Sequence, residues 1–531
     1  MIRVLFFLVA FTIFQTGVAQ EDAWVFLTDK ENVATAIENP ISILTQKAID
    51  RKQNFNIPID ARDVPVNESY ITQIKSQSGI SVLAKSKWFN TVYVRGSEEN
   101  INALSALSFV ESIDFANNNL NTSKAKQDKF TNKFQEELVT FNYGNASNQT
   151  EMISVDNLHL NNYTGTGITI AVLDAGFPNA NTLGGFERLR NAGNIKGVYD
   201  FVNRDLDVYN TSQHNHGTLV LSTMAGYIEN EFVGTAPDAS YYLFITEDVS
   251  SETPAEESYW VEAAERADSL GVDIINTSLG YKTFDNANYT YTDAEMNGTT
   301  AFISRGANIA FEKGLLLVTS AGNEGEDGIT APGDSSNTLT IGAVDASGNS
   351  AWFSSVGSNF QPTQKPDVVA QGQSSALINE NNVVVAANGT SFSSPILAGG
   401  IACLWQALPN FSNAEIMQLV RESASQYSAP DNYLGYGIPN LFAAFNAGLL
   451  VASHNNLQIE LYPNPSSGKV FFKVQNGDLQ VSVFSVLGKF VGEYAVSSEA
   501  PEIDLSTLQA GLYLVKVIQN ETVKTFKVLK Q

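Results

Sequence analysis

Residues 146–448 alternate strand-like and helical segments, and this pattern constrains the fold of the chain more than any other feature. Two of the strand-like segments, residues 168–173 and 315–318, are largely apolar, as expected for strands buried on both faces of a sheet. Alternation of such strands with helices is typical of a parallel sheet covered by helices on both sides. We therefore predict an α/β fold with a doubly wound parallel sheet for this part of the chain.

Each of these two strands leads into a polar residue. Residues 168–173 run directly into Asp174, and Asn323 follows the second strand between Gly322 and Glu324-Gly325. Open α/β sheets place active-site groups at the carboxyl ends of their strands. Asp174 and Asn323 are therefore candidate site residues, although each has an ordinary alternative explanation as a turn former.

Ser391 follows Gly389-Thr390 and precedes an apolar stretch, residues 396–408, that predicts a buried helix. Free backbone N–H groups at such a helix N-terminus favour a developing negative charge. A serine becomes a nucleophile when a base takes its proton, and the candidate base is His216, which opens a helical stretch to residue 228. Taken singly, Ser391 is better explained as a helix N-cap and His216 as a core histidine.

The four segments, in the order Asp174, His216, Asn323 and Ser391, resemble the subtilisin family of serine proteases (subtilases). The resemblance covers residues 146–448 and includes three further landmarks, residues 273–280, 365–370 and 435–437. Any one of these motifs is modest evidence, whereas all of them in the family's order are strong evidence.

The resemblance implies a role for each residue. Ser391 attacks the scissile carbonyl, His216 takes its proton, and Asp174 fixes the imidazole tautomer. Asn323, with the Ser391 N–H, binds the oxyanion of the intermediate. The segment Ser278-Leu279-Gly280 pairs with the peptide substrate as an added strand. The chemistry needs no cofactor.

A metal site is not predicted. The loop after the His216 helix, residues 227–232, is shorter than in members of the family that bind calcium there. An insertion over residues 281–300 is rich in Asn, Asp and Tyr, but its acidic residues do not have the spacing of a calcium loop. We expect a solvated loop there and leave structural calcium open as a possibility without a supporting motif.

The amino-acid composition argues against some classes of binding partner. The net charge is −25, from 56 Asp and Glu against 31 Lys and Arg, which argues against nucleic acid and anionic membrane surfaces. The single cysteine, Cys403, excludes an intramolecular disulfide and is expected to be a buried apolar residue. We expect a monomer whose partners are protein or peptide substrates.

The segments before the catalytic domain predict export and maturation. Residues 1–19 have the charged, apolar and small-residue regions of a signal peptide. Residues 20–117 alternate strand and helix signals, with a helix expected over residues 41–51, and resemble the α+β prodomains of subtilases. The resemblance implies a folding chaperone and temporary inhibitor; the alternative is an unrelated N-terminal domain. Residues 118–145 are polar and predict a linker that is cut during maturation.

Residues 457–531 change to short alternating strands separated by turns, which predicts a small β-sandwich. Its Tyr-Pro-Asn-Pro entry and lysine-bearing terminus resemble the sorting domain of type IX secretion cargo. That resemblance implies recognition by outer-membrane secretion machinery and a secreted or cell-surface location, reached through the periplasm. The alternative is a surface- or carbohydrate-binding module.

Together these features predict a secreted serine endopeptidase made as a self-processed zymogen, acting through an Asp-His-Ser triad and an acyl-enzyme. One alternative is a catalytically silent member of the family that binds without cutting. A serine-carboxyl peptidase is disfavoured because His216 stands where that class has acidic residues. An α/β-hydrolase is disfavoured because Ser391 lacks the Gly-x-Ser-x-Gly elbow: residue 393 is Ser.

Overall fold

The computed structural model describes residues 20–120, 141–210 and 212–455, and residues 460–531 apart from 474–478, 486–489, 498–500 and 520–521. The predicted signal peptide and most of the predicted linker lie outside the described residues. Within the described part of the chain, no helix has the length and apolar character needed to cross a bilayer.

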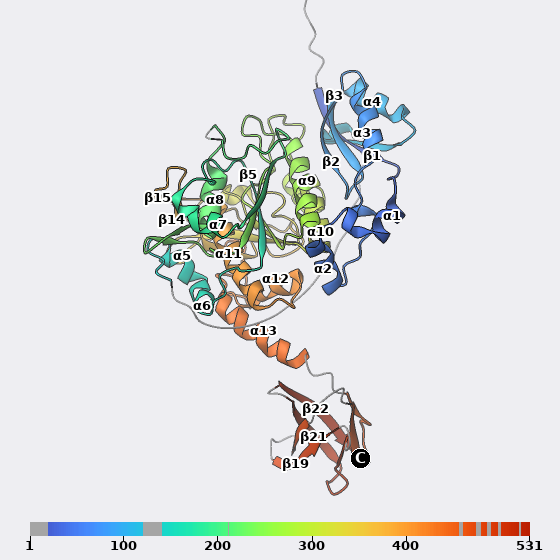
Figure 1. The fold of residues 1–531 in the computed structure, drawn as a ribbon, viewed down its shortest axis with the longest axis vertical. Helices are drawn as coiled ribbons and strands as arrows, with labels where there is room; N and C mark the ends of the chain where they lie inside the picture. The colour runs from blue at the N-terminus through green and yellow to red at the C-terminus, as the bar shows by residue number, and fades with distance from the viewer. Residues whose placement is uncertain are drawn as a thin grey trace, which may run out of the picture.

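The first domain is a four-stranded antiparallel sheet in the order β2-β3-β1-β4. The strands are β1 Gln20–Leu27, β2 Ser81–Ser86, β3 Thr91–Ser97 and β4 Val110–Phe115. Helices α3 Glu68–Lys75 and α4 Glu98–Ala103 pack on one face and enclose a core of their own. On the other face, Trp24 and Tyr93 join the core of the next domain, and the Trp24 ring stacks on Phe302 at 4.6 Å. The sheet therefore lies against the catalytic domain, as Figure 1 shows.

The segment between β1 and α3, residues 28–67, is called the arm below. It holds α1 Val33–Glu38, α2 Gln46–Asn54 and two short 3₁₀ helices, Pro40–Ser42 and Ala61–Asp63. The helix predicted over residues 41–51 is wrong in its bounds. The Thr45 hydroxyl accepts a hydrogen bond from the Ala48 N–H and caps α2, so the helix begins at Gln46.

The central domain contains a seven-stranded parallel sheet in the order β13-β12-β11-β10-β5-β9-β6. The strands are β5 Thr169–Asp174, β6 Ile195–Asp200, β9 Ser240–Ile245, β10 Ile274–Thr277, β11 Leu316–Ser320, β12 Thr338–Val344 and β13 Val368–Gln371. Helices α9 Ala255–Leu270 and α10 Phe302–Glu312 cover one face. Helices α8 His216–Ala225, α11 Thr390–Ala407 and α12 Asn413–Glu422 cover the other. The predicted doubly wound α/β fold is confirmed.

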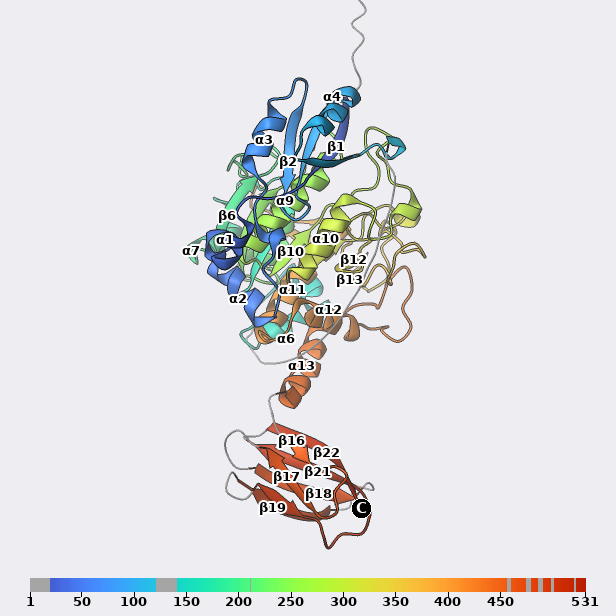
Figure 2. The ribbon, with the colours of Figure 1, turned by 90° about the vertical axis from the view of Figure 1, so that its right-hand side faces the viewer.

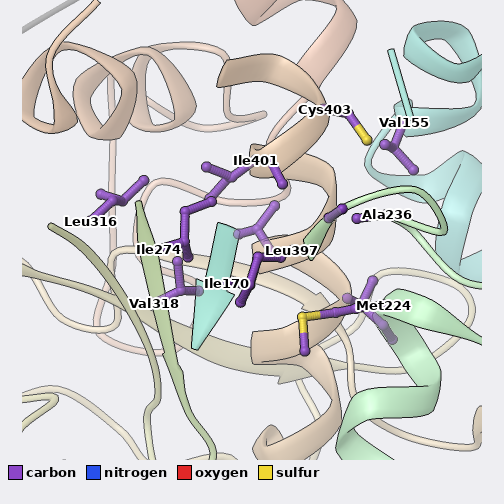
Figure 3. Close-up of a cluster of buried hydrophobic side chains, with 14 of the residues drawn as sticks. Val155, Ile170, Met224, Ala236, Ile274, Leu316, Val318, Leu397, Ile401 and Cys403 are labelled. Carbon is purple, nitrogen blue, oxygen red and sulfur yellow. The ribbon is translucent and has the colours of Figure 1, made fainter. Parts of the chain in front are cut away.

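Helix α11 is the centre of the larger core. Figure 3 shows Leu397 and Ile401 of this helix facing Ile170, Ile274 and Val318 of the sheet, and all five side chains are fully buried. A helix that is apolar on all sides is stable only when it is enclosed, and sheet and helices surround this one. The prediction that Cys403, also on α11, is buried is confirmed.

Smaller elements surround this core. Helix α8 ends at Ala225, earlier than the predicted residue 228, because Tyr227–Ile228 (β7) pairs with Phe232–Val233 (β8) as a short hairpin. The other elements are α5 Ser147–Met152, α6 Val155–His159, α7 Glu187–Asn191, β14 Ser375–Ile378, β15 Val384–Ala387, and the 3₁₀ helices Asn118–Leu120, Gly184–Phe186, Asp293–Glu295, Gly325–Asp327 and Leu104–Ala106.

Helix α13, Leu441–Asn455, leads to a C-terminal domain that lies beyond its end in Figures 1 and 2. Two antiparallel sheets, β16-β17-β20 and β19-β18-β21-β22, enclose an apolar core that includes Phe472, Val483 and Val515. The strands are β16 Glu460–Tyr462, β17 Lys469–Lys473, β18 Leu479–Ser485, β19 Phe490–Val496, β20 Glu502–Asp504, β21 Gly511–Gln519 and β22 Thr522–Lys530. The predicted β-sandwich is confirmed, with β16, β19 and β20 additional to the strands that its sequence indicates.

Candidate active site

Asp174 and His216 form the best-defined pair at the carboxyl edge of the parallel sheet. Asp174 is the last residue of β5 and fully buried, and His216 is the first residue of α8. The two side chains meet at 2.7 Å between His216 Nδ1 and Asp174 Oδ1, which also accepts the Ala175 N–H at 2.8 Å. A proton on Nδ1 satisfies this carboxylate and leaves Nε2 as the free acceptor of the imidazole ring.

Two glycines let α8 approach β5 closely enough for this hydrogen bond. Gly217 follows His216, and a Cβ at this position would lie 2.5 Å from the carbonyl oxygen of Gly176. A Cβ at Gly176 would in turn lie 2.7 Å from the carbonyl oxygen of His214. Any larger residue at either position would push the imidazole away from Asp174.

Ser391 lies in the first turn of α11, and its hydroxyl donates to the carbonyl oxygen of Ser278 at 3.3 Å. Among the described residues, no hydrogen bond joins this hydroxyl to His216. The two segments are nevertheless neighbours, because the ring of Phe392 lies 5.9 Å from the ring of His216. Catalytic hydrogen bonds are often long or poorly aligned without substrate and tighten when it binds.

A network of polar side chains fixes the first turn of α11 against the end of β10. Pro395 has no N–H, so the carbonyl of Ser391, four residues earlier, lacks its helical partner and accepts the Ser278 hydroxyl at 2.9 Å instead. The Asn276 amide donates to the same hydroxyl at 3.1 Å and accepts from Ser394 at 3.1 Å. Nothing in the sequence pattern singled out Asn276, Ser394 or Pro395 for this role.

The side chain of Asn323 has its oxygen and nitrogen in different environments. Its Oδ1 accepts the backbone N–H of Thr390 at 2.9 Å and the Thr390 hydroxyl at 3.1 Å. This arrangement directs the amide oxygen to Thr390 and leaves the Nδ2 group as the donor. Asn323 is exposed, so its donor is accessible to a ligand beside the first turn of α11.

The predicted substrate segment, Ser278-Leu279-Gly280, directly follows β10. Gly280 is exposed, and a Cβ at this position would lie 2.1 Å from the hydroxyl of Thr330. The next residue, Tyr281, forms two backbone hydrogen bonds with Ala331, at 2.9 and 3.0 Å. Thr330 and Ala331 therefore form the wall next to this segment, which sequence reasoning did not identify.

The insertion predicted as a solvated loop over residues 281–300 is only partly exposed. Tyr281, Tyr289 and Tyr291 are buried. The Tyr281 hydroxyl donates to Glu247, and the Tyr291 hydroxyl donates to Glu257. The Tyr289 hydroxyl donates to Glu21 and accepts the Asp22 N–H. The prediction is wrong for these residues because the tyrosines find polar partners on segments that are distant in sequence. Within the described residues, no group of three His, Cys, Asp or Glu side chains could hold a metal ion.

Two groups at the site have shifted pKa values. Burial opposes the charged form of His216, but the charge and hydrogen bond of Asp174 outweigh it, and its pKa lies above the ordinary value of 6.5. Glu247 also contributes to this rise. Burial raises the pKa of Glu247 itself to about 7, although the Tyr281 hydroxyl hydrogen-bonds its carboxylate.

His159 and Cys403 are buried and hydrogen-bonded to the same backbone carbonyl. His159 is fully buried between the Tyr143 hydroxyl at 2.8 Å and the Thr235 carbonyl at 2.9 Å, and burial lowers its pKa to about 4. The Cys403 thiol donates to the same carbonyl at 3.1 Å, and burial raises its pKa well above the ordinary value.

Three family models match the chain. They are the Peptidase S8 propeptide domain of Bacteroidota over residues 22–133, the subtilase family over residues 165–437, and the secretion system C-terminal sorting domain over residues 460–531. The chain belongs to the subtilase family.

Individual relatives cover the same central part. Over 293 residues the chain is 31% identical to subtilisin NAT from Bacillus subtilis subsp. natto. The matched residues make up 54% of this chain and 68% of that protein. It is 29% identical over 293 residues to a subtilisin from Bacillus pumilus, covering 94% of it. Among solved structures, MycP1 with its propeptide removed has a TM-score of 0.45 at 22% identity, over 56% of this chain and 96% of that one.

The protein is thus a subtilisin-like serine endopeptidase, made as a zymogen with an S8 propeptide domain and secreted with a C-terminal sorting domain. The sorting domain directs it to the cell surface or the extracellular space. These matches replace the alternatives of an unrelated N-terminal domain and of a carbohydrate-binding module.

The raised pKa of His216 predicts the acid limb of the activity profile. Only neutral imidazole accepts a proton, so kcat/KM on an uncharged short peptide should rise with pH through a midpoint above 6.5. Glu247→Gln removes a charge that raises this pKa, so its midpoint should move to lower pH. Maximal activity near pH 4, or a Glu247→Gln midpoint shifted upward, would contradict this assignment.

Proposed function

We propose that Asp174, His216 and Ser391 form the catalytic triad of this endopeptidase. The observation that carries the proposal is the 2.7 Å hydrogen bond between the Asp174 carboxylate and His216 Nδ1, at the edge of the sheet where α11 presents Ser391. Nε2 takes the proton of the Ser391 hydroxyl as its oxygen attacks the scissile carbonyl. The same proton passes to the leaving amine, and water then hydrolyses the acyl-enzyme by the reverse sequence.

Asn323 supplies one donor of the oxyanion hole in this proposal. Two hydrogen bonds from Thr390 hold its amide oxygen, so Nδ2 is available to the negative oxygen of the tetrahedral intermediate. The backbone N–H of Ser391, in the first turn of α11, is the second donor. An amide serves here because it donates a hydrogen bond without titrating.

The substrate lies along Ser278-Leu279-Gly280 as an added strand. Main-chain pairing gives affinity that does not depend on sequence, as an endopeptidase requires, and side-chain contacts set preference. The residue whose carbonyl is attacked sits between this segment and Asn323, beside Thr330. Because Gly280 has no Cβ, the Thr330 hydroxyl can occupy the space beside it.

Maturation and export complete the proposal. The polar segment over residues 118–145 separates two domains with their own cores, and we place the self-cleavage there. The C-terminal domain has a separate core and contributes none of the proposed catalytic residues, so its role is recognition by the outer-membrane secretion machinery.

Ser391→Ala tests the nucleophile and self-processing together. The variant should fold, remain uncut between residues 118 and 145, and show no peptidase activity above background, because it lacks the oxygen that attacks the scissile carbonyl. N-terminal sequencing and peptide hydrolysis measure both effects. Normal turnover, or cleavage of the purified variant free of other proteases, would refute the assignment.

Asn323→Leu tests the oxyanion donor. Removal of one such donor costs about 10² to 10³ in kcat, so kcat should fall by this factor while KM changes little. Thr390→Val is a partial control: it removes one of the two bonds that orient the amide and should produce a smaller loss. A loss confined to KM for Asn323→Leu would show that the residue binds substrate instead.

Deletion of residues 457–531 separates export from catalysis. In the natural host the truncated protein should remain inside the outer membrane, whereas its kcat/KM on a short peptide should stay within a few-fold. Fractionation by immunoblot and peptide hydrolysis by the purified protein measure the two effects. Normal appearance of the truncated enzyme in the medium would remove the sorting role.

A further inference from the structure

The arm contacts the catalytic domain at a place that the four-stranded sheet of the prodomain does not cover. Residues 28–67 leave the sheet after β1 and return to it at α3. Figures 1 and 2 show the arm extending from the sheet along the catalytic domain, with α2 beside the end of α9. The arm therefore joins the two domains, in addition to contacts within the prodomain such as that of Lys30 with the Lys87 carbonyl.

Four charged side chains form the centre of this contact. Lys52 of the arm lies 2.9 Å from Asp268 of α9 and 3.2 Å from Asp63 of the arm. Asp63 in turn lies 2.7 Å from Lys313, which follows α10. The side chains of Lys52, Asp63 and Asp268 are fully buried, and that of Lys313 is 1% exposed. The network alternates in sign and crosses the domain boundary twice.

Further bonds extend the contact on both sides of this network. Arg51 donates to the carbonyl of Val272 and pairs with Asp268, and the Thr45 N–H donates to the carbonyl of Ser269 at 2.9 Å. Lys47 reaches Asp273 at 2.5 Å and the Thr169 hydroxyl at 2.8 Å. At the other end, Arg62 lies 2.8 Å from Glu312.

These partners lie at or before the first residues of strands of the parallel sheet. Thr169 begins β5, Val272 and Asp273 precede β10, and Lys313 precedes β11. The candidate active site lies at the opposite ends of the same strands. Asp174 lies five positions after Thr169 along β5, which is ~16 Å at ~3.3 Å per residue. The arm therefore holds the catalytic domain without approaching the catalytic residues.

We propose that the arm is an anchor that keeps the prodomain bound to the catalytic domain after the linker is cut, and that its charged network controls how fast the prodomain leaves. Cutting residues 118–145 removes the covalent connection but changes none of these contacts. Lys52 cannot leave without exposing Asp268 to water, and Asp63 cannot leave without exposing Lys313. The inference depends on the proposed maturation in one respect, because it assumes that the linker is cut.

The experiment uses the full chain with Ser391→Ala and a site-specific protease sequence placed within residues 121–140. After the added protease has cut it, size-exclusion chromatography over time gives the rate at which the prodomain separates. Because the cut does not depend on Ser391, this result is independent of whether the enzyme processes itself.

Lys52→Met should increase the separation rate by about 100-fold, because it removes the buried cation between Asp268 and Asp63 and leaves these buried carboxylates with only Arg51 and Lys313 as partners. Lys47→Ala should increase it only a few-fold, because the Lys47 side chain is 43% exposed. The matched control is Lys75→Met on α3 of the same domain, which is exposed and outside the arm, and which should leave the rate unchanged.

The prodomain sheet supplies the competing contact. The Glu265 carboxylate of α9 accepts the N–H groups of Lys87 and Trp88, both at 2.9 Å. If Glu265→Gln speeds separation while Lys52→Met and Lys47→Ala match Lys75→Met, the sheet alone holds the prodomain and the proposal is wrong.

If Lys52→Met does not fold, Lys47→Ala and Arg62→Ala decide the outcome by the same measurement. With Ser391 intact, Lys52→Met should shorten the delay before activity appears and leave the final kcat/KM unchanged.

Discussion

Parallel pairing of β5, β10 and β11 is the constraint on which the rest of the structure depends. Leu173, Thr277 and Thr319 lie side by side in this sheet, so the residues that follow each of them emerge at one edge. Asp174 and Ser278 directly follow two of these residues, and Asn323 lies four positions after the third, where Thr390 holds its side chain. Helix α11 packs on one face of this sheet and places its first turn, with Ser391, at that edge.

The catalytic candidates could be predicted from the sequence because each is part of a short local pattern. A buried strand ending in Asp174, a histidine opening a helix, and a serine beginning an apolar helix are all visible within about ten residues. The same applies to the fold class, because strand and helix periodicities are local properties. The need for Gly176 and Gly217 is visible only in the structure, where backbone atoms of the two segments lie too close for a Cβ between them.

Residues that support the site were not predictable, because their partners are distant in sequence. Tyr281 was expected to be exposed in an insertion, yet it is buried and bonded to Glu247, 34 positions away. Lys52 gives no local sign of burial, and its partner Asp268 is 216 positions away. Helix α2 was predicted to start too early for a different reason: the Thr45 cap outweighs the apolar residues before it.

The contact between prodomain and enzyme must be specific and yet separable, and buried ion pairs satisfy both demands. Apolar groups in place of these ion pairs would add to the apolar surface, such as Phe302 beneath Trp24, that becomes exposed on the mature enzyme, and would favour aggregation. Charged groups such as Asp268 and Lys313 are instead well solvated once the arm is gone, and removal of both partners into water recovers the hydration that the complex denied them. Such pairs add little net stability, but mispairing them is costly, so they define one docking geometry. Chemistry takes place at one end of the sheet and prodomain anchoring at the other, and the strands between the two ends are buried along their whole length.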